Sequence, residues 1–404
     1  MSSVRARVWR FTVERGRAGA EAVEAVEMRQ DLLPVSLAAV VNVNALACDL
    51  RRTVDQRVRD HEISLLLSYI AGRPGDGPLE VDCPALDSSS LHIRRFVSEC
   101  TGLGVMSAAS EGLFDWRAGK DRVSSFDVLP GKLVGTYAKK GVRPDLLYDL
   151  AAGPLAGEAR GRRRDHQPMF PPGKGTAAQK ARLLQLAQWS DHHDDHAYFM
   201  SWVWLGAGGV YVDVFLPDNS PAMAMLKPKW SQRSGSARVW RFDVPRPDSR
   251  RRARPEEDLE QGMLLAAQAG PAPDPGGDST AGGAGAGEGT VVSRAAPVVE
   301  EAMDRSFGRE GNVLGALSGA EVRGRWIRGD AVGQARHEVL LGVLDKRVEV
   351  DHRARRLQTS QRADRLDMYL EGRLLTVVHP VDSPRPSWER IRSELVDQPG
   401  AQAT

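Results

Sequence analysis

The chain has 404 residues, enough for two or three domains, and its hydrophobic content of 41% and charged content of 27% are ordinary for a globular protein. A formal net charge of only +2 excludes a global field that would draw the whole molecule onto nucleic acid or a membrane. Nine lysines leave 46 of the 55 basic residues as arginine, whose planar group suits phosphate and carboxylate. Local patches of charge must therefore recognise any nucleic acid or membrane partner. The high share of arginine can also reflect a general bias in the composition of the chain.

Cysteine usage favours a reducing environment. Cys48, Cys83 and Cys100 lie far apart without a CxxC pair, so the sequence predicts neither a disulfide framework nor a cysteine-based zinc site. The longest apolar run, 197–217, is interrupted by Asp213 and by glycines, which argues against a membrane helix. We expect a cytoplasmic or otherwise intracellular protein with no membrane partner.

The N-terminal part is predicted to be mainly helical after a single strand. Residues 5–15 alternate aromatic with polar side chains, which is typical of a strand. The Glu-rich stretch that ends at Leu33 is predicted to be a helix, and Pro34 is expected to open a second one. Apolar residues then keep helical spacing to about residue 60.

The middle of the chain is predicted to contain a helix, a loop, a second helix and a hairpin. Serines at 88–90 are good residues to open a helix. Residues 157–176 have the composition of an exposed loop, and a helix is expected from Thr176 to Trp189. Two apolar stretches around a Gly-rich turn predict a hairpin over 198–217.

A short repeat connects two distant segments. "ARVWRFDV" at 237–244 matches "ARVWRFTV" at 6–13 in all but one position. The flanking residues do not align, so both a duplicated strand and a coincidence remain open.

The C-terminal part follows a Gly/Pro-rich stretch, 270–289, that is predicted to be a flexible linker. The expected elements beyond it are a helix near 296–306, strands near 321–328 and 337–350, a hairpin turning at Glu371-Gly372, and a last helix near 386–397.

Together these patterns predict an α+β protein with a helical N-terminal region, a central β-hairpin layer, and a small mixed α/β C-terminal domain after a flexible Gly/Pro-rich linker. The predicted boundaries are 1–157, 158–264, 265–290 for the linker, and 291–404.

The stretch "SDHHDDHAYF" at 190–199 is the main candidate for a metal site. On a helix, His192, Asp195 and His196 share one face, because residues three and four apart are neighbours. On an extended chain, His192, Asp194 and His196 align instead. The alternative is a solvated helix end, where histidines bind the last carbonyls and the aspartates end the helix. A divalent metal is therefore a hypothesis, and no other cofactor is expected.

No assembled catalytic motif is found. "PPGKGT" at 171–176 has glycine after Lys174, where a phosphate-binding loop needs Ser or Thr, and "PGKLVGT" at 130–136 fails likewise. The sequence also lacks a GxSxG elbow. We therefore predict no catalytic residues.

Two arginine clusters are the candidates for binding nucleic acid. Such clusters attract phosphates without reading bases, although solubilising charge on loops explains them equally. Arginines interleaved with Trp9 and Phe11 form a pattern that can stack bases, although a buried core face also explains those aromatic residues. The candidate binding residues are Arg160, Arg162, Arg163, Arg164 and Lys174 in one cluster, and Arg250, Arg251, Arg252 and Arg254 in the other.

These observations favour a non-enzymatic structural or interaction protein. We expect it to self-associate as a homo-oligomer, and a sequence-tolerant contact with nucleic acid would fit a coat-type protein or a component of a nucleoprotein complex. The alternatives are a metal-dependent hydrolase or nuclease centred on His192–His196, and a regulatory module that binds a protein partner.

Overall fold

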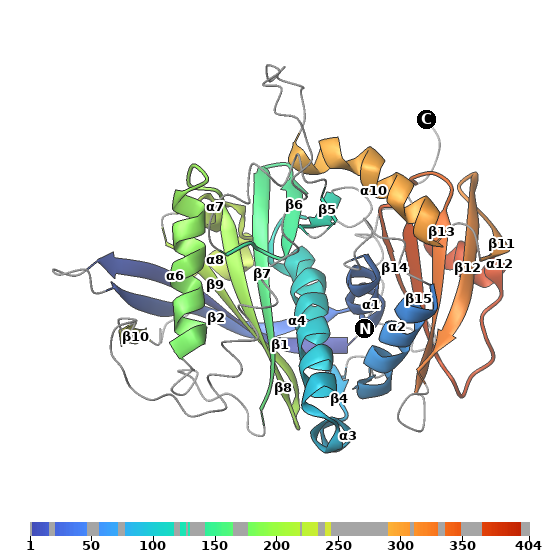
Figure 1. Ribbon diagram of the computed structural model, residues 1–404, viewed down its shortest axis with the longest axis horizontal. Helices are drawn as coiled ribbons and strands as arrows, with labels where there is room; N and C mark the ends of the chain where they lie inside the picture. The colour runs from blue at the N-terminus through green and yellow to red at the C-terminus, as the bar shows by residue number, and fades with distance from the viewer. Residues whose placement is uncertain are drawn as a thin grey trace, which may run out of the picture.

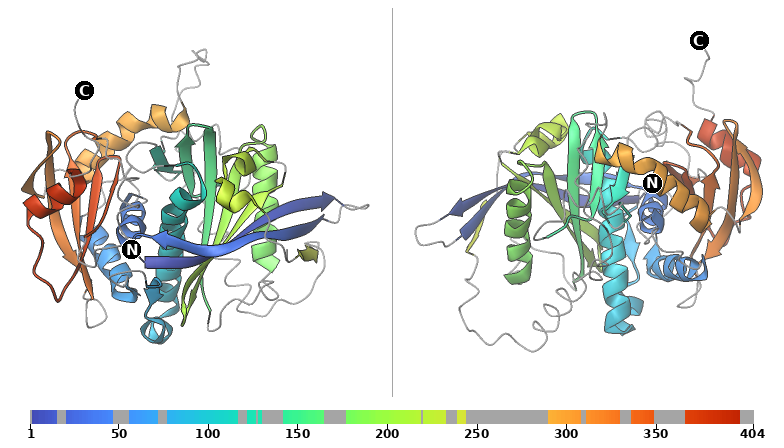
Figure 2. Two further views of the ribbon diagram at one scale, coloured as in Figure 1. Left: turned by 180° about the vertical axis from the view of Figure 1, so that it is seen from behind. Right: turned by 45° about the horizontal axis from the view of Figure 1, so that its top comes forward.

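The computed structural model describes residues 2–15, 21–46, 56–71, 77–116, 122–126, 128–129, 142–164, 177–218, 220–232, 239–243, 290–307, 311–329, 336–348 and 366–396. Helices and two main sheets are stacked in layers (Figure 1). Helix α6 covers one face of the larger sheet, and α1, α2 and α4 lie between the two sheets (Figures 1 and 2). Helix α12 packs on the outer side of the smaller sheet.

The larger sheet has eight strands in the order β10-β2-β1-β9-β8-β7-β6-β5. Neighbouring strands are antiparallel, except that β1 pairs with β9 and β7 with β8 in parallel. The bounds are β1 Ser2–Arg15, β2 Glu21–Val35, β5 Arg122–Ser125, β6 Leu146–Leu150, β7 Gly153–Arg163, β8 Tyr198–Gly206, β9 Gly209–Pro217 and β10 Val239–Asp243.

The smaller sheet is antiparallel, with five strands in the order β11-β12-β13-β15-β14. Its strands are β11 Asn312–Leu317, β12 Ala320–Arg328, β13 His337–Leu344, β14 Asp367–Glu371 and β15 Leu374–Pro380. A short pair, β3 Ile70–Ala71 with β4 Glu80–Val81, lies beside the helices.

The described helices are α1 Leu37–Leu46, α2 Gln56–Tyr69, α3 Cys83–Ser88, α4 Leu91–Leu113, α6 Ala177–Asp191, α7 Pro221–Met225, α8 Pro228–Ser231, α10 Val291–Phe307 and α12 Trp388–Val396. None of them is both long and apolar enough to cross a membrane. Helix α10 runs from the larger sheet to the smaller one (Figure 1), where Asp304 forms an ion pair with Arg373 of the β14–β15 turn.

The prediction of a helical N-terminal region is wrong, because the chain starts with two long paired strands. The Glu-rich stretch forms β2, and Pro34 lies within that strand. Its alanines and glutamates favour a helix locally, but Val23 and Ala25 are fully buried at alternate positions between β1 and β10. Pairing on both edges overrides the local preference. The first helix begins only at Leu37.

Several local predictions are confirmed. The Ser90 hydroxyl accepts a hydrogen bond from the Ile93 amide and caps α4. The hairpin over 198–217 is β8 and β9, and every residue of β8 is buried, which explains why both of its faces are apolar. In the C-terminal part, β14 and β15 form the predicted hairpin, and Ile391 and Leu395 of α12 are buried against the smaller sheet. The predicted linker at 270–289 lies outside the described residues.

Helix α4 packs closely on β7 through two glycines. A Cβ atom added at Gly161 would lie 1.6 Å from the Ser98 carbonyl oxygen, and one at Gly102 would lie 2.6 Å from the Gly161 amide nitrogen. The prediction that 157–176 is an exposed loop is therefore wrong for residues 157–163, which belong to this covered strand. Their many arginines and glycines resembled a loop, but the glycines provide the space for α4.

The two repeat segments occupy opposite edges of one strand. Both β1 and β10 pair antiparallel with β2, so the two copies run parallel to each other on either side of it. Ala25 of β2 pairs with Phe11 of the first copy and with Trp240 of the second. Strand β2 thus lies between the two copies, and within the described residues they do not pair with each other.

Candidate anion-binding face

The face of the larger sheet that α6 partly covers carries arginine and aromatic residues in rows across four adjacent strands. In each row the residues are register partners on β1, β9, β8 and β7. We call this surface, together with Arg164, the arginine–aromatic face. Its first row is Arg5, Tyr211, Trp204 and Arg162, and its second row is Arg7, Asp213, Trp202 and Arg160.

Asp213 organises the centre of the arginine–aromatic face. Its side chain is fully buried and forms a bidentate ion pair with Arg7. The distances are 2.6 Å from Nε to Oδ1 and 2.8 Å from Nη2 to Oδ2. The indole N–H groups of Trp9 and Trp204 donate to the same carboxylate at 3.0 Å and 2.8 Å. Four donors therefore satisfy this carboxylate, and its ion pair is with Arg7.

Arg5 and Arg164 extend the positive charge to either side of this pair. The Arg5 guanidinium lies 5.5 Å from the centre of the Tyr211 ring, and that of Arg164 lies 4.4 Å from the Trp204 ring. Neither group forms an ion pair with any residue that the structure describes. Arg5 is exposed and Arg164 half-buried, and burial lowers the pKa of Arg164. Two guanidinium groups thus lie on a rigid aromatic surface without a carboxylate partner.

A buried ionic cluster lies at the β7 edge of the face. Glu158 Oε1 binds Arg160 at 2.5 Å and Arg182 of α6 at 2.6 Å, so one carboxylate oxygen serves two arginines. Burial and the neighbouring Glu158 raise the pKa of Asp145 to about 7. Asp145 accepts a hydrogen bond from the Ala159 amide. Because Asp145 is partly protonated near neutral pH, the cluster keeps an excess of positive charge there.

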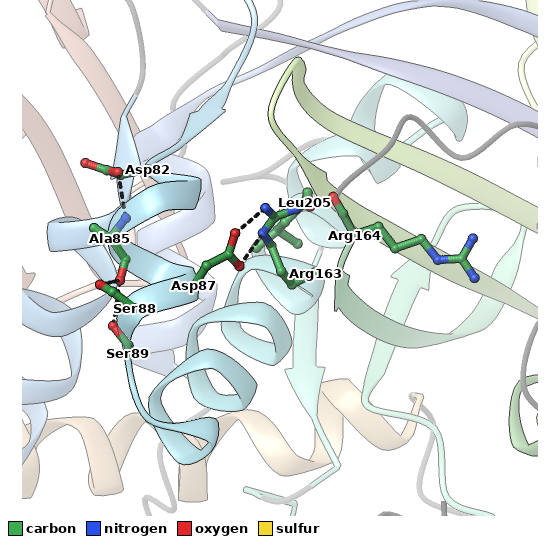
Figure 3. A network of polar contacts seen from close by, with 8 residues as sticks. All are labelled: Asp82, Ala85, Asp87, Ser88, Ser89, Arg163, Arg164 and Leu205. Carbon is green, nitrogen blue, oxygen red and sulfur yellow. Dashed lines mark hydrogen bonds and ion pairs between the residues drawn. The ribbon is translucent and has the colours of Figure 1, made fainter. Parts of the chain in front are cut away.

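The four predicted arginines at 160–164 separate onto the two sides of the sheet. Arg163 points to α3, where it forms a two-pronged ion pair with Asp87, and Arg164 extends the opposite way (Figure 3). Asp87 is held in a short helix that Asp82 caps by accepting from the Ala85 amide (Figure 3). The structure therefore brings Arg160, Arg162 and Arg164 together on one face and engages Arg163 elsewhere.

Other predicted binding residues lie outside the described residues. These are Lys174 of the first cluster and Arg250, Arg251, Arg252 and Arg254 of the second. The predicted set of binding residues did not include Arg5, Arg7, Tyr211 or Asp213. Arg7 was considered only as part of the arginine–aromatic pattern of β1, although the alternation of that strand places Arg5 and Arg7 on one side. Trp9 and Phe11 are core residues, 0% and 1% exposed, so these two rings are not available to stack on bases.

The histidine cluster lies at the end of α6. The Nδ1 atoms of His192 and His193 contact the carbonyl oxygens of Gln188 and Trp189, four residues earlier. His196 directs its Nδ1 to the Ala197 carbonyl at 2.9 Å, and burial lowers its pKa. Helix α6 ends at Asp191, and Asp194 and Asp195 in the turn that follows adopt positive φ angles of 56° and 55°. Among the described residues, no three His, Cys, Asp or Glu side chains are placed to hold a metal ion.

No protein-family model matches the chain, and neither a curated protein nor a solved structure is significantly similar to it. The function is therefore inferred from the geometry of the arginine–aromatic face alone.

Proposed function

We propose that this protein is a non-enzymatic binding component that holds nucleic acid by its phosphates at the arginine–aromatic face. The observation that carries the proposal is the pair of guanidinium groups, Arg5 and Arg164, that lie on aromatic rings without an acidic partner. Guanidinium groups bind phosphate oxygens through two parallel hydrogen bonds. Cross-strand pairing fixes both aromatic supports in one row, so little conformational entropy is lost when a phosphate binds.

The same geometry favours binding that is insensitive to base sequence. Trp202 and Trp204 are 1% and 0% exposed, so their rings are not available to stack on bases, and the Trp204 ring is covered by the Arg164 guanidinium group. Contacts to phosphates position a nucleic acid but carry no sequence information. We therefore expect sequence-tolerant binding that weakens steeply with salt.

A double substitution tests the proposal. Arg5→Gln with Arg164→Gln removes both unpartnered guanidinium groups and keeps side chains of similar shape. The matched control is Arg323→Gln with Arg390→Gln, which removes the same charge from exposed ion pairs in the C-terminal part. Fluorescence anisotropy with a labelled single strand and a labelled duplex gives the affinity of each variant.

We expect the test variant to bind both nucleic acids more weakly by about tenfold or more, because each charge-assisted hydrogen bond contributes roughly 1.5–3 kcal/mol. The control variant should bind like the unchanged protein. Equal losses in both variants would mean that only net charge matters, and no detectable binding by the unchanged protein would refute the proposed function outright.

The predicted self-association and the alternative role as a regulatory protein-binding module stay predictions, because no contact within the described chain bears on either.

A further inference from the structure

A groove of about 560 Å³ opens at the opposite end of the same sheet face. It lies where β1 and β9 end, where β8 begins, and where α6 passes into the histidine-rich turn. Its volume is within the range of small-molecule sites in proteins. Phe11, Val13 and Tyr198 supply much of its apolar wall, and Asp191, Asp195 and Asp218 supply its carboxylates.

The charge of the groove is negative. Among the described residues that line it, none is a lysine, arginine or histidine. Asp218 is balanced by Arg10 beside the groove, at 3.2 Å from carboxylate oxygen to Nε. Asp195 is exposed, and within the described part of the chain its carboxylate forms no ion pair. A ligand that neutralises this carboxylate must carry a positive charge.

Tyr198 is an independent sign of a ligand. Its side chain is 2% exposed and lines the groove, yet its hydroxyl forms no hydrogen bond with any described residue. Tyrosine hydroxyls in such largely buried side chains usually have a partner. The hydroxyl oxygen of Tyr198 is not among the fully enclosed, unsatisfied polar atoms, so it remains accessible from the groove and a ligand there can bond to it. Burial, with a contribution from Asp191, raises the pKa of Tyr198, so the hydroxyl stays neutral and can accept a hydrogen bond.

We propose that this groove binds a small organic cation, namely a protonated amine with a compact apolar body. Asp195 provides the charge that balances the ammonium group, with Asp191 beside it on the groove wall. The Tyr198 hydroxyl accepts an ammonium N–H, and the apolar body packs against Val13 and Pro217. This inference does not depend on nucleic-acid binding at the other end of the sheet face.

Three probes of nearly equal shape test the inference on the full chain by isothermal titration calorimetry. Phenethylamine is a cation, phenethyl alcohol is neutral and hydrocinnamate is an anion. We expect the amine to bind at least about tenfold more tightly than the alcohol, because only the ammonium group can form an ion pair with the Asp195 carboxylate. We expect no binding of the anion. Equal affinity for amine and alcohol would overturn the proposal.

Variants then assign the contacts. Asp195→Asn removes the charge but keeps the shape, and Tyr198→Phe removes only the hydroxyl. Glu301→Gln on the exposed side of α10 is the matched control. We expect both groove variants to weaken amine binding while the control binds as before, with unchanged melting temperatures confirming that each is folded. Amine affinity that is the same in Asp195→Asn as in Glu301→Gln would overturn the assignment.

Discussion

The two sheets differ in what they bury beneath their outer helices. Under α12, the smaller sheet presents an apolar layer that includes Leu340, Leu370 and Val377. Under α6, the larger sheet buries Asp213 with Arg7 and Glu158 with Arg182. An apolar face is sufficient to hold a helix, and desolvating charges is costly. The smaller sheet also buries one charged group on this face, Glu338 at the start of β13, beside His379 and Arg385. The larger sheet differs in burying two ion pairs beneath its helix, which is more charge than packing alone needs.

The α6 face also differs between its two ends. One end presents Arg5 and Arg164 on aromatic rings, and the other opens into the groove lined by Asp191 and Asp195. The strand register keeps these opposite charges apart along β1 and β8. One face of the sheet thus carries guanidinium groups at one end and carboxylates at the other, and we propose an anion for the first end and a cation for the second.

The largest expected effect comes from breaking the central ion pair. Asp213→Ala leaves Arg7 buried without its carboxylate and leaves two indole N–H groups without their acceptor. We expect a loss of about 3–5 kcal/mol in the free energy of unfolding, measured with urea. Glu321→Ala, which removes an exposed pair with Arg323 in the smaller sheet, should cost about 1 kcal/mol or less. Similar losses for the two variants would remove the contrast between the sheets.

A smaller effect concerns pH. The pKa of Asp145 is raised from 3.8 to about 7, so the folded protein holds a proton there that the unfolded chain has released over this interval. The contribution of Asp145 to the free energy of unfolding therefore falls as pH rises from about 4 to about 7 and is constant above that.

Asp145→Asn should remove this dependence, which is at most about 1.4 kcal/mol per pH unit. Urea unfolding at several pH values measures it as the difference between the variant and the unchanged protein. A difference that does not vary with pH would mean that folding does not raise the pKa of Asp145.

The smallest expected loss in the free energy of unfolding comes from a substitution in the apolar layer between α12 and the smaller sheet. Ile391→Val in α12 removes one buried methylene group and should cost about 1 kcal/mol. No ionisable group is involved, so the loss should be the same at every pH at which the protein is folded. A pH-dependent loss would indicate that charge also contributes under α12.

Local patterns in the sequence predicted those elements whose partners are near in the chain. The β8–β9 hairpin, the Ser90 cap and the β14–β15 hairpin all depend on neighbours within a few residues. β2 was missed although its main partner, β1, directly precedes it, because its alanines and glutamates favour a helix. Its second edge is completed by β10, more than two hundred residues away in the printed chain.

The candidate site was only partly predictable. Arg160, Arg162 and Arg164 were identified as a cluster, but their partners on β1 and β9 are brought to them by the parallel pairs β1–β9 and β7–β8. No local signal predicts which distant strands pair in parallel. The aspartates of the histidine-rich turn were weighed as metal ligands, whereas Asp191 and Asp195 line a groove whose other walls come from β1 and β9.

The most direct measurement of phosphate binding is the dependence of nucleic-acid affinity on salt. For the unchanged protein we predict that the logarithm of the binding constant falls linearly with the logarithm of the salt concentration. For the variant with Arg5→Gln and Arg164→Gln, the slope should be shallower by about two, one for each lost phosphate contact. A slope that is identical in the two proteins would contradict phosphate binding at the arginine–aromatic face.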